Sequence, residues 1–242
     1  NVSAEEIGAL IEKDQVLSAK VLRLANSPFY GFPSRIASVA HAVVVLGLNV
    51  VKGLTLCATA FDMMRNAGMN ELWRHSLGVA MTAHILGTNA AMKNPEEVFV
   101  AGLLHDIGKV VLYVKWPDVG QQITTVTRNT SRPLMDAEQE LFEVTHADVG
   151  GWLASAWHLP TSLREPILHH HTPAAAQDAK LQTAIVHVAD VLVKGLACGN
   201  PGDDLVPPLS RQAWDLVGLD AQSLAHCLTQ ATEEFQTIDD YL

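Results

Sequence analysis

Aromatic residues and cysteines are scarce in this sequence. Aromatic side chains make up 6% of the 242 residues, and there are three cysteines. Cys57, Cys198 and Cys227 lie far apart and form no C-x-x-C pair, which argues against both a disulfide framework and a thiolate metal site. No uninterrupted apolar run reaches about 18 residues, and the start of the chain has no basic segment followed by an apolar one. We therefore expect a cytoplasmic protein with no membrane contact.

Basic residues are also too few to balance the acidic ones. Lys and Arg number 16 and Asp and Glu number 26, which gives a formal charge of -10. A chain of this charge repels phosphate backbones and anionic lipid. Nucleic acid is therefore not an expected partner.

Apolar residues are plentiful, at 48% of the chain, and most are Ala, Leu and Val. Such small and straight-chain residues favour close helix packing over strands, and the predicted fold class is all-α. The chain begins at Asn1 without an initiator methionine, which leaves open that it is part of a longer protein with a further domain.

Apolar periodicity and capping residues predict a series of helices. Ser3 and Glu6 predict a capping box, Asn94 is expected to cap a helix whose first residue is Pro95, and Gly108 is expected to end that helix or tighten its turn. The other predicted helices span about 15–25, 38–46, 49–64, 70–85, 136 onward, 146–157, 161–171 and 179–194, with a C-terminal pair after 210.

Polar and Gly/Pro-rich stretches predict two loops, at 124–132 and 195–210. We divide the chain into an N-terminal helical part at 1–65, a helical core at 66–195 and a C-terminal extension at 196–242.

The strongest local signal is the pair His105-Asp106, set in an apolar segment between Gly102 and Lys109. Imidazole nitrogen and carboxylate oxygen both bind divalent cations, and a carboxylate can bridge two of them. Burying both groups without a cation or partners would be costly. One such pair arises often by chance, so the interpretation depends on the other histidines and acids.

Those other residues follow a recognisable order along the chain. They are His75 on the preceding helix, His146 at the start of a later one, the triplet His169-His170-His171, and Asp190 on the helix after that. This order resembles the HD superfamily of metal-dependent phosphohydrolases, in which ligands converge from separate helices.

Four segments sharpen the resemblance to the HDOD family within that superfamily. They are residues 22–31, 73–76, 101–109 and 157–173. The discriminating one contains Asn26-Ser27-Pro28. The resemblance implies a multi-helix HD-superfamily bundle with an N-terminal helical subdomain, of a kind often found in bacterial signalling proteins.

The resemblance also implies a site for one or two divalent ions, of iron, manganese, zinc or nickel. The implied ligands of one centre are His75, His105, Asp106 and Asp190, and those of a second are His146, His170 and His171, with Asp106 bridging. Three further residues are weaker candidates, namely Glu71, His169 and His187. For Glu71 a solvated helix acid is the favoured interpretation. His169 is expected to be a bystander or to support a ligand, and His187 to support or replace one.

Two functions stay open. The favoured one is a regulatory domain that acts through contacts with signalling proteins or fused signalling domains. The alternative is a phosphohydrolase in which Asp106 is catalytic and Lys109 holds the phosphate, although Lys109 equally suits a helix C-terminus. The Gly-Tyr-Pro segment of the related cyclic-dinucleotide phosphodiesterases is absent, since residues 172–176 read Thr-Pro-Ala-Ala-Ala.

Some histidines also have a purely structural interpretation. A stripe that packs in the core would account for the burial of His146, although we favour ligation. His41, His84, His158 and His226 have no partner motif, and we expect them to be structural or solvated. A metal-free scaffold with hydrogen-bonded histidines is the third possibility.

Overall fold

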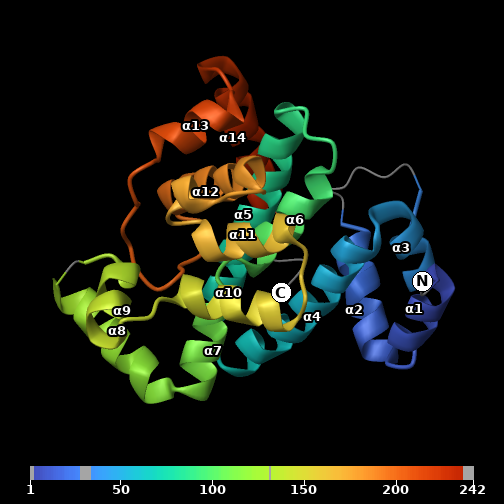
Figure 1. The fold of residues 1–242 in the computed structure, drawn as a ribbon, viewed down its shortest axis with the longest axis horizontal. Helices are drawn as coiled ribbons and strands as arrows, with labels where there is room; N and C mark the ends of the chain where they lie inside the picture. The colour runs from blue at the N-terminus through green and yellow to red at the C-terminus, as the bar shows by residue number, and fades with distance from the viewer. Residues whose placement is uncertain (1–2, 28–33, 131, 237–242) are drawn as a thin grey trace. The chain divides into compact units, whose positions relative to one another are not determined.

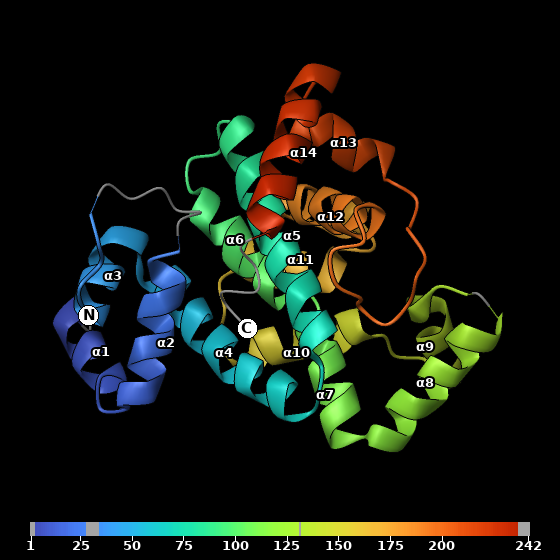
Figure 2. The same cartoon turned by 180° about the vertical axis from the view of Figure 1, so that it is seen from behind.

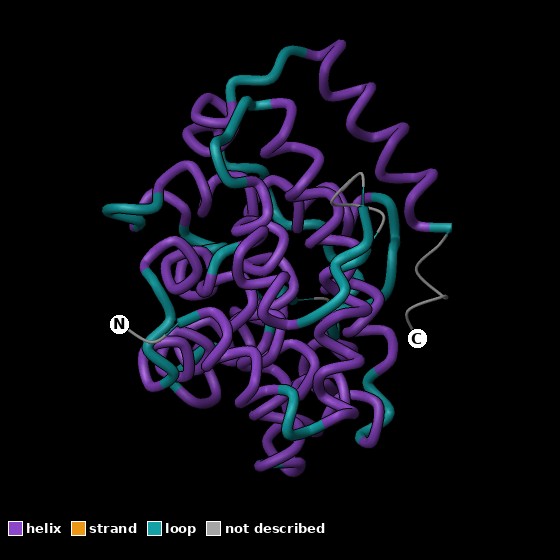
Figure 3. The backbone as a smooth tube through the Cα atoms, turned by 90° about the vertical axis from the view of Figure 1, so that its right-hand side faces the viewer, coloured by secondary structure: helices purple, strands orange, loops and turns teal. Residues whose placement is uncertain are grey.

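The computed structural model describes residues 3–27, 34–130 and 132–236. Within these residues every regular element is a helix and none is a strand, as the tube in Figure 3 shows. The all-α prediction is therefore confirmed. The residues group into two compact units, Asn1–Asp62 and Met63–Leu242, which are described separately.

The N-terminal unit consists of short helices. They are α1 (Ala4–Ile11), α2 (Gln15–Ala25), α3 (Val39–Leu46) and the larger part of α4 (Leu48–Asn66). The predicted capping box is present, because Ser3 Oγ accepts from the Glu6 N–H and the Glu6 carboxylate accepts from the Ser3 N–H. α1 packs tightly on α3, since a Cβ on Gly8 would lie 2.8 Å from Ala40 N.

Asn26 holds together the segment that follows α2. Its side-chain amide donates to the carbonyls of Leu22 and Ile36, both at 2.8 Å, and its oxygen accepts from the Ile36 N–H at 2.7 Å. Asn26 therefore joins the end of α2 to the chain ahead of α3. Pro28 and the three residues after it in the discriminating segment lie outside the described residues.

The larger unit contains the remaining helices. They are α5 (Asn70–Asn89), α6 (Pro95–Leu104), α7 (Ile107–Lys115), α8 (Pro117–Thr130), α9 (Leu134–Phe142), α10 (His146–Ala156), α11 (Thr161–His169), the 3₁₀ helix η2 (Pro173–Ala175), α12 (Lys180–Gly195), α13 (Arg211–Val217) and α14 (Ala221–Phe235). Figures 1 and 2 show α5 in the middle of this unit, and α6, α12 and α14 all pack against it.

Small residues let these helices approach closely. A Cβ on Gly102 would lie 2.7 Å from Ala80 Cα, so α6 rests directly on the backbone of α5. A Cβ on Gly78 would lie 3.1 Å from Cys198 Sγ, next to the end of α12. The middle of α5, residues 72–87, is consequently buried apart from the half-buried Arg74 and His84, and this burial places its polar residue His75 in the core.

The predicted loop at 124–132 is wrong for residues 124–130, which belong to α8. The polar composition concealed a helix whose apolar face is narrow and centred on the fully buried Ile123. Thr124 and Thr127 add hydrogen bonds from their hydroxyls to the carbonyls of Gly120 and Ile123, so their polar groups are satisfied within the helix.

Gly108 does not end a helix. α6 already ends at Leu104, and Gly108 lies in the first turn of α7. A glycine is needed at this position because α10 packs directly on it. A Cβ on Gly108 would lie 1.9 Å from the carbonyl oxygen of His146. Asn94 stands at the predicted N-cap of α6, but its side chain makes no capping hydrogen bond.

The loop expected at 195–210 and the pair of helices after it are confirmed. Among the described helices, none has both the length and the apolar character needed to cross a membrane.

Candidate metal centre

Five segments of the larger unit bring histidines and aspartates to one point. His75 comes from α5, His105 and Asp106 from the junction of α6 and α7, His146 from the first residue of α10, His170 and His171 from the end of α11, and Asp190 from α12. The junction matters because α6 stops at Leu104 and α7 starts at Ile107, which lets two consecutive residues face the same site. The sequence placed these residues on separate helices, and the structure brings them together.

The ligand atoms of His75, His105 and Asp190 lie within 4.8 Å of one another, and we call these residues the inner group. His75 Nε2 is 3.0 Å from Asp190 Oδ1, and His105 Nε2 is 3.8 Å from the same oxygen. All three side chains are at most 2% exposed. The inner group is therefore closed off from solvent.

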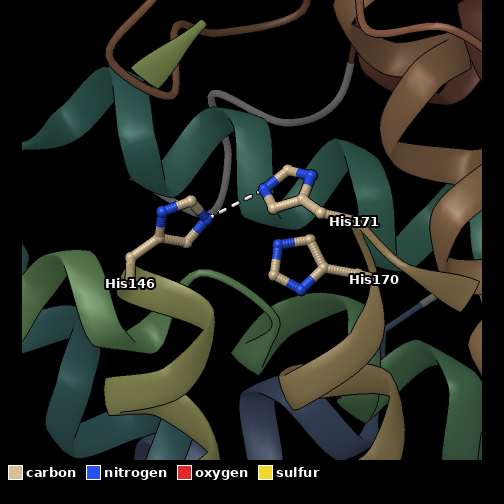
Figure 4. Close-up of side chains that lie close together, drawn as sticks. All are labelled: His146, His170 and His171. Carbon is tan, nitrogen blue, oxygen red and sulfur yellow. Dashed lines mark hydrogen bonds between the residues drawn. The ribbon is translucent and has the colours of Figure 1, made fainter. Parts of the chain in front are cut away.

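The ligand atoms of His146, His170 and His171 also lie within 4.8 Å of one another, and we call these residues the outer group. Figure 4 shows the three rings facing a common point, with the Nε2 atoms of His146 and His171 2.9 Å apart. Two nitrogens that each lie about 2.1 Å from one ion are separated by about 3.0 Å at an octahedral angle and by about 3.4 Å at a tetrahedral angle. The spacing of this pair is thus compatible with a shared ion.

Asp106 lies between the two groups. Its Oδ2 is 3.3 Å from His105 Nε2 of the inner group, and its Oδ1 is 3.3 Å from His146 Nε2 and 3.7 Å from His170 Nε2 of the outer group. The Lys109 ammonium donates to Oδ2 at 2.8 Å. The carboxylate can therefore bridge two ions, with Lys109 beside it.

Hydrogen bonds fix two of the rings so that Nε2 faces the site. Nδ1 of His105 lies 2.7 Å from the Gly102 carbonyl, and Nδ1 of His170 lies 2.9 Å from the Ile167 carbonyl. Because a carbonyl only accepts, each Nδ1 carries the hydrogen, and a neutral ring then directs an Nε2 lone pair into the site.

In the described structure, six buried atoms of the site have no partner in hydrogen-bond geometry. They are Nδ1 and Nε2 of His75, Nε2 of His105 and His170, Oδ1 of Asp106 and Oδ1 of Asp190. Two of them, His75 Nε2 and Asp190 Oδ1, lie 3.0 Å apart. Buried polar atoms are normally satisfied, and a cluster of orphans with converging lone pairs requires an explanation. Divalent cations bound within the two groups would satisfy the Nε2 and Oδ1 atoms among them, so the residues fit a metal site.

Burial keeps most of these rings neutral. It lowers the pKa of His75. Burial and the neighbouring imidazoles hold the pKa values of His170 and His171 well below the ordinary histidine value. His105 differs, because the Asp106 carboxylate outweighs its burial and raises its pKa. Neutral imidazole is the form that binds metal.

The two aspartates stay ionised although burial opposes it. His105 and Lys109 hold the pKa of Asp106 well below the ordinary carboxyl value, and His75 does the same for Asp190. Asp106 in turn raises the pKa of Lys109 against the effect of burial. The site therefore combines ionised carboxylates with the neutral rings of His75, His170 and His171, which is a combination that binds divalent metal.

The three weaker candidates lie outside these groups in the described structure. Glu71 is exposed on α5, and His169 is half-buried at the end of α11. His187 is buried, but its Nδ1 lies 2.7 Å from the His170 carbonyl and its Nε2 accepts from the Ser210 N–H at 3.0 Å. Both nitrogens of His187 are thus used, and its role is to tie α12 to the chain before α13.

The sequence analysis did not identify two buried glutamates near the site. Glu138 on α9 accepts from His146, and Glu165 on α11 accepts from the backbone N–H groups of residues 177, 178 and 179. Glu165 thereby fixes the turn between the His170-His171 pair and α12. The sequence shows only that Glu138 lies eight residues before the candidate ligand His146. Because the two residues belong to different helices, this spacing does not predict a contact between them.

A cavity of about 390 Å³ adjoins the outer group. Its polar wall includes Lys109, His146, His171 and Lys194, and its apolar wall includes Leu134, Met135 and the prolines 207 and 208. No residue of the inner group lines it. The outer group is therefore the side of the site that a small ligand can reach.

Several known proteins are similar to this chain in sequence or in structure. A Treponema pallidum (strain Nichols) protein described as uncharacterized is 26% identical over 211 residues, which is 85% of this chain and 41% of the relative. This chain therefore spans less than half the length of that relative. A crystal structure of an HDOD domain protein of unknown function from Geobacter sulfurreducens is 28% identical, covers 100% of this chain and 87% of its own, and superposes with a TM-score of 0.78.

A second crystal structure, of a candidate signal transduction protein from Marinobacter aquaeolei VT8, is 20% identical and has a TM-score of 0.73. The match covers 99% of this chain and 55% of that one, and at this identity it supports the fold alone. The family model of the HDOD domain matches residues 1–173. This match covers well over half of the 242 residues, so the chain belongs to the HDOD domain family.

Proposed function

We propose that this HDOD domain is a bacterial regulatory domain that binds one or two divalent metal ions. The observation that carries the proposal is the set of orphaned, buried nitrogen and oxygen atoms that converge from four segments. Leaving these groups unsatisfied would cost several kcal/mol in total, at about 1–3 kcal/mol for each group. A bound cation removes that cost.

The proposed ligands follow the two groups. His75, His105 and Asp190 would hold one ion, and His146, His170 and His171 would hold the other, with Asp106 between them as a ligand that both ions could share. Mixed nitrogen and carboxylate ligands suit iron, manganese, zinc or nickel, so the metal is not specified by the ligand types.

The regulatory assignment rests on the family and on the burial of the site. HDOD domains are often found in bacterial signalling proteins, and this chain belongs to that family. The inner group has no route to a ligand through the cavity, so an ion there would stabilise the bundle. We propose that the partners are signalling proteins or fused signalling domains, whose contacts depend on the metal-bound state.

The test compares metal-loaded protein with protein stripped by a chelator. We expect metal to raise the midpoint of thermal unfolding, because a ligand that binds only the folded state adds about 2.7 kcal/mol at 100 times its Kd. We also expect the loaded protein not to hydrolyse generic phosphomonoesters or phosphodiesters. An unchanged unfolding midpoint would contradict the metal site, and metal-dependent hydrolysis would contradict the purely regulatory role.

A second candidate function is metal-dependent phosphohydrolysis, and the cavity is the observation that favours it. Lys109, His146 and His171 line this cavity together, so a phosphate entering it would meet a buried ammonium and the proposed ion site. When bound, the ions would supply an activated water. Lys109 would neutralise phosphoryl oxygens, and the Asp106 carboxylate would hold the Lys109 ammonium in place.

The two candidates respond differently to one pair of variants. Lys109→Met removes the charge that would hold phosphate but leaves all proposed ligands in place. If the domain is a phosphohydrolase, this variant keeps its metal and loses turnover, whereas Asp106→Asn loses both. Absence of turnover in the wild-type protein with each of the four metals would leave the regulatory function as the sole candidate.

A further inference from the structure

Glu138 is fully buried on α9, close to the outer group, although neither the family resemblance nor the ligand set includes it. One of its oxygens, Oε2, accepts from the backbone N–H of His146 at 2.9 Å and lies 2.6 Å from Nδ1 of the His146 ring. A backbone N–H can only donate, so Oε2 acts as an acceptor toward His146. The ring hydrogen therefore lies on Nδ1.

This hydrogen bond determines which ring atom faces the site. With Nδ1 protonated, a neutral His146 carries its lone pair on Nε2. Nε2 lies 3.3 Å from Asp106 Oδ1 and 2.9 Å from His171 Nε2, at the point that the outer group surrounds. Rotation of the ring would break the contact with Glu138, so the ring is also held in orientation.

His146 needs this carboxylate because of its place at the start of a helix. His105 and His170 stand at the ends of helices, and each finds its acceptor in the carbonyl three residues earlier. His146 is the first residue of α10, where the preceding residue Thr145 is the N-cap and no helical turn precedes it. An acceptor must come from another element, and α9 provides it.

A carboxylate does more than a carbonyl in this position. It is a stronger acceptor than a carbonyl, and a carboxylate that supports a histidine in this way strengthens the bond of that histidine to a metal. Within the described residues, the other oxygen of Glu138, Oε1, has no hydrogen-bond partner. His146 is therefore the site residue to which Glu138 is hydrogen-bonded.

We propose that Glu138 is a positioning residue that fixes the tautomer and orientation of His146 and thereby strengthens binding of the outer ion. This inference rests on the proposed metal site. Loss of such a supporting carboxylate typically weakens metal binding by about 10- to 100-fold. In the part of the chain that the structure describes, the hydrogen bonds of Glu138 reach His146 and no residue of the inner group, so binding of an inner ion should not change.

The first measurement is the tautomer of His146 by ¹⁵N NMR of the metal-free, full-length chain. We expect the Nδ1–H form in the wild-type protein and a mixture with the Nε2–H form in Glu138→Ala. An Nε2–H form of His146 in the wild type would overturn the inference, and this result does not depend on whether metal binds.

The second measurement is Zn²⁺ affinity by competition with a chromophoric chelator. Glu138→Gln keeps the size of the side chain and an oxygen for the His146 N–H but removes the charge. We expect it to weaken the outer ion about 10-fold with no change in the inner ion. Glu138→Ala should weaken it more, up to about 100-fold.

The matched control is Glu140→Gln on the same helix. Glu140 is exposed and pairs with Arg132, so the substitution should leave both affinities unchanged. A well-folded Glu138→Gln variant with wild-type affinity for both ions would overturn the inference. A wild-type protein that binds no Zn²⁺ would instead refute the proposed site together with the effect of Glu138 on it.

Discussion

The inner and outer ligand groups share Asp106 but differ in how their side chains are held. The inner group is closed to solvent, and none of its residues lines the cavity beside the site. Two outer residues, His146 and His171, do line it, and His171 is half-buried. The difference indicates that an inner ion would serve mainly the stability of the bundle and an outer ion any contact with a ligand.

The supporting contacts differ in the same way. Within the inner group, His105 is supported by a carbonyl of its own helix, which folds with it. In the outer group, His146 depends on Glu138 from α9 and on the packing of α10 against α7. The outer group therefore depends more strongly on contacts between elements far apart in the sequence, and substitutions should separate the two groups.

The largest effect is expected from Gly108→Ala. The added Cβ would lie 1.9 Å from the His146 carbonyl oxygen, so α7 and α10 must separate. We expect a loss of about 3 kcal/mol or more in the free energy of unfolding, and loss of the outer ion before the inner one. Urea unfolding and Zn²⁺ titration measure the two effects.

Gly195→Ala is the matched control, because a Cβ at Gly195 meets nothing within 4 Å. Its stability should stay unchanged or rise by up to about 1 kcal/mol. Equal free energies of unfolding for the two variants would show that α7 and α10 leave room for a side chain at residue 108, which would contradict the close contact.

Single-ligand variants should separate the two ions. Asp190→Asn removes a charged ligand of the inner group, and His171→Gln removes a ligand of the outer group. We expect each to lose one ion, with an affinity drop on the order of 100-fold, equivalent to about 2.7 kcal/mol. Isothermal titration should then show one remaining site in each variant. Loss of both ions from either variant would indicate a single shared site.

The smallest effect is expected from His84, which lies on the same helix as His75 and should make stability depend on pH. Burial lowers the pKa of His84 from 6.5 to about 4. The neutral ring therefore contributes stability that is complete above pH 6.5 and is lost as the pH falls from 6.5 towards 4. After allowance for its partial exposure, the loss should reach about 2 kcal/mol at pH 4.

His84→Gln should reduce this pH dependence, as followed by urea unfolding between pH 4 and pH 7. His226→Gln is the control, because His226 is exposed on α14. If both variants keep the wild-type pH dependence, His84 does not carry the effect. The result also separates this ring from the site histidines, which both variants retain.

Sequence patterns predicted the helical class and most helix positions because capping residues and apolar periodicity act locally. Ser3 with Glu6 is one example. The pattern failed at 124–130, where tertiary packing of Ile123 stabilises a helix of polar composition. The residues around Gly108 were misjudged for a related reason, because their geometry depends on α10, which lies about 40 residues further along the chain.

The candidate site was predicted in part. The order of histidines and aspartates located the residues that the structure gathers, and their binding of metal stays a prediction. His187 and Glu71 were weaker candidates, and both lie outside the two groups. Their positions could not be predicted, because helix spacing alone does not reveal which partner a side chain meets. Glu138 was missed because its contact with His146 crosses from α9 to α10.

The most direct test of the central claim is elemental analysis of wild-type and Asp106→Asn protein, both purified without a metal-affinity tag. Asp106 is the carboxylate shared by the inner and outer groups. The account predicts one to two equivalents of a divalent metal in the wild type and a near-complete loss in the variant, with the helical circular dichroism unchanged. Metal absent from the wild type, or present equally in both proteins, would contradict it.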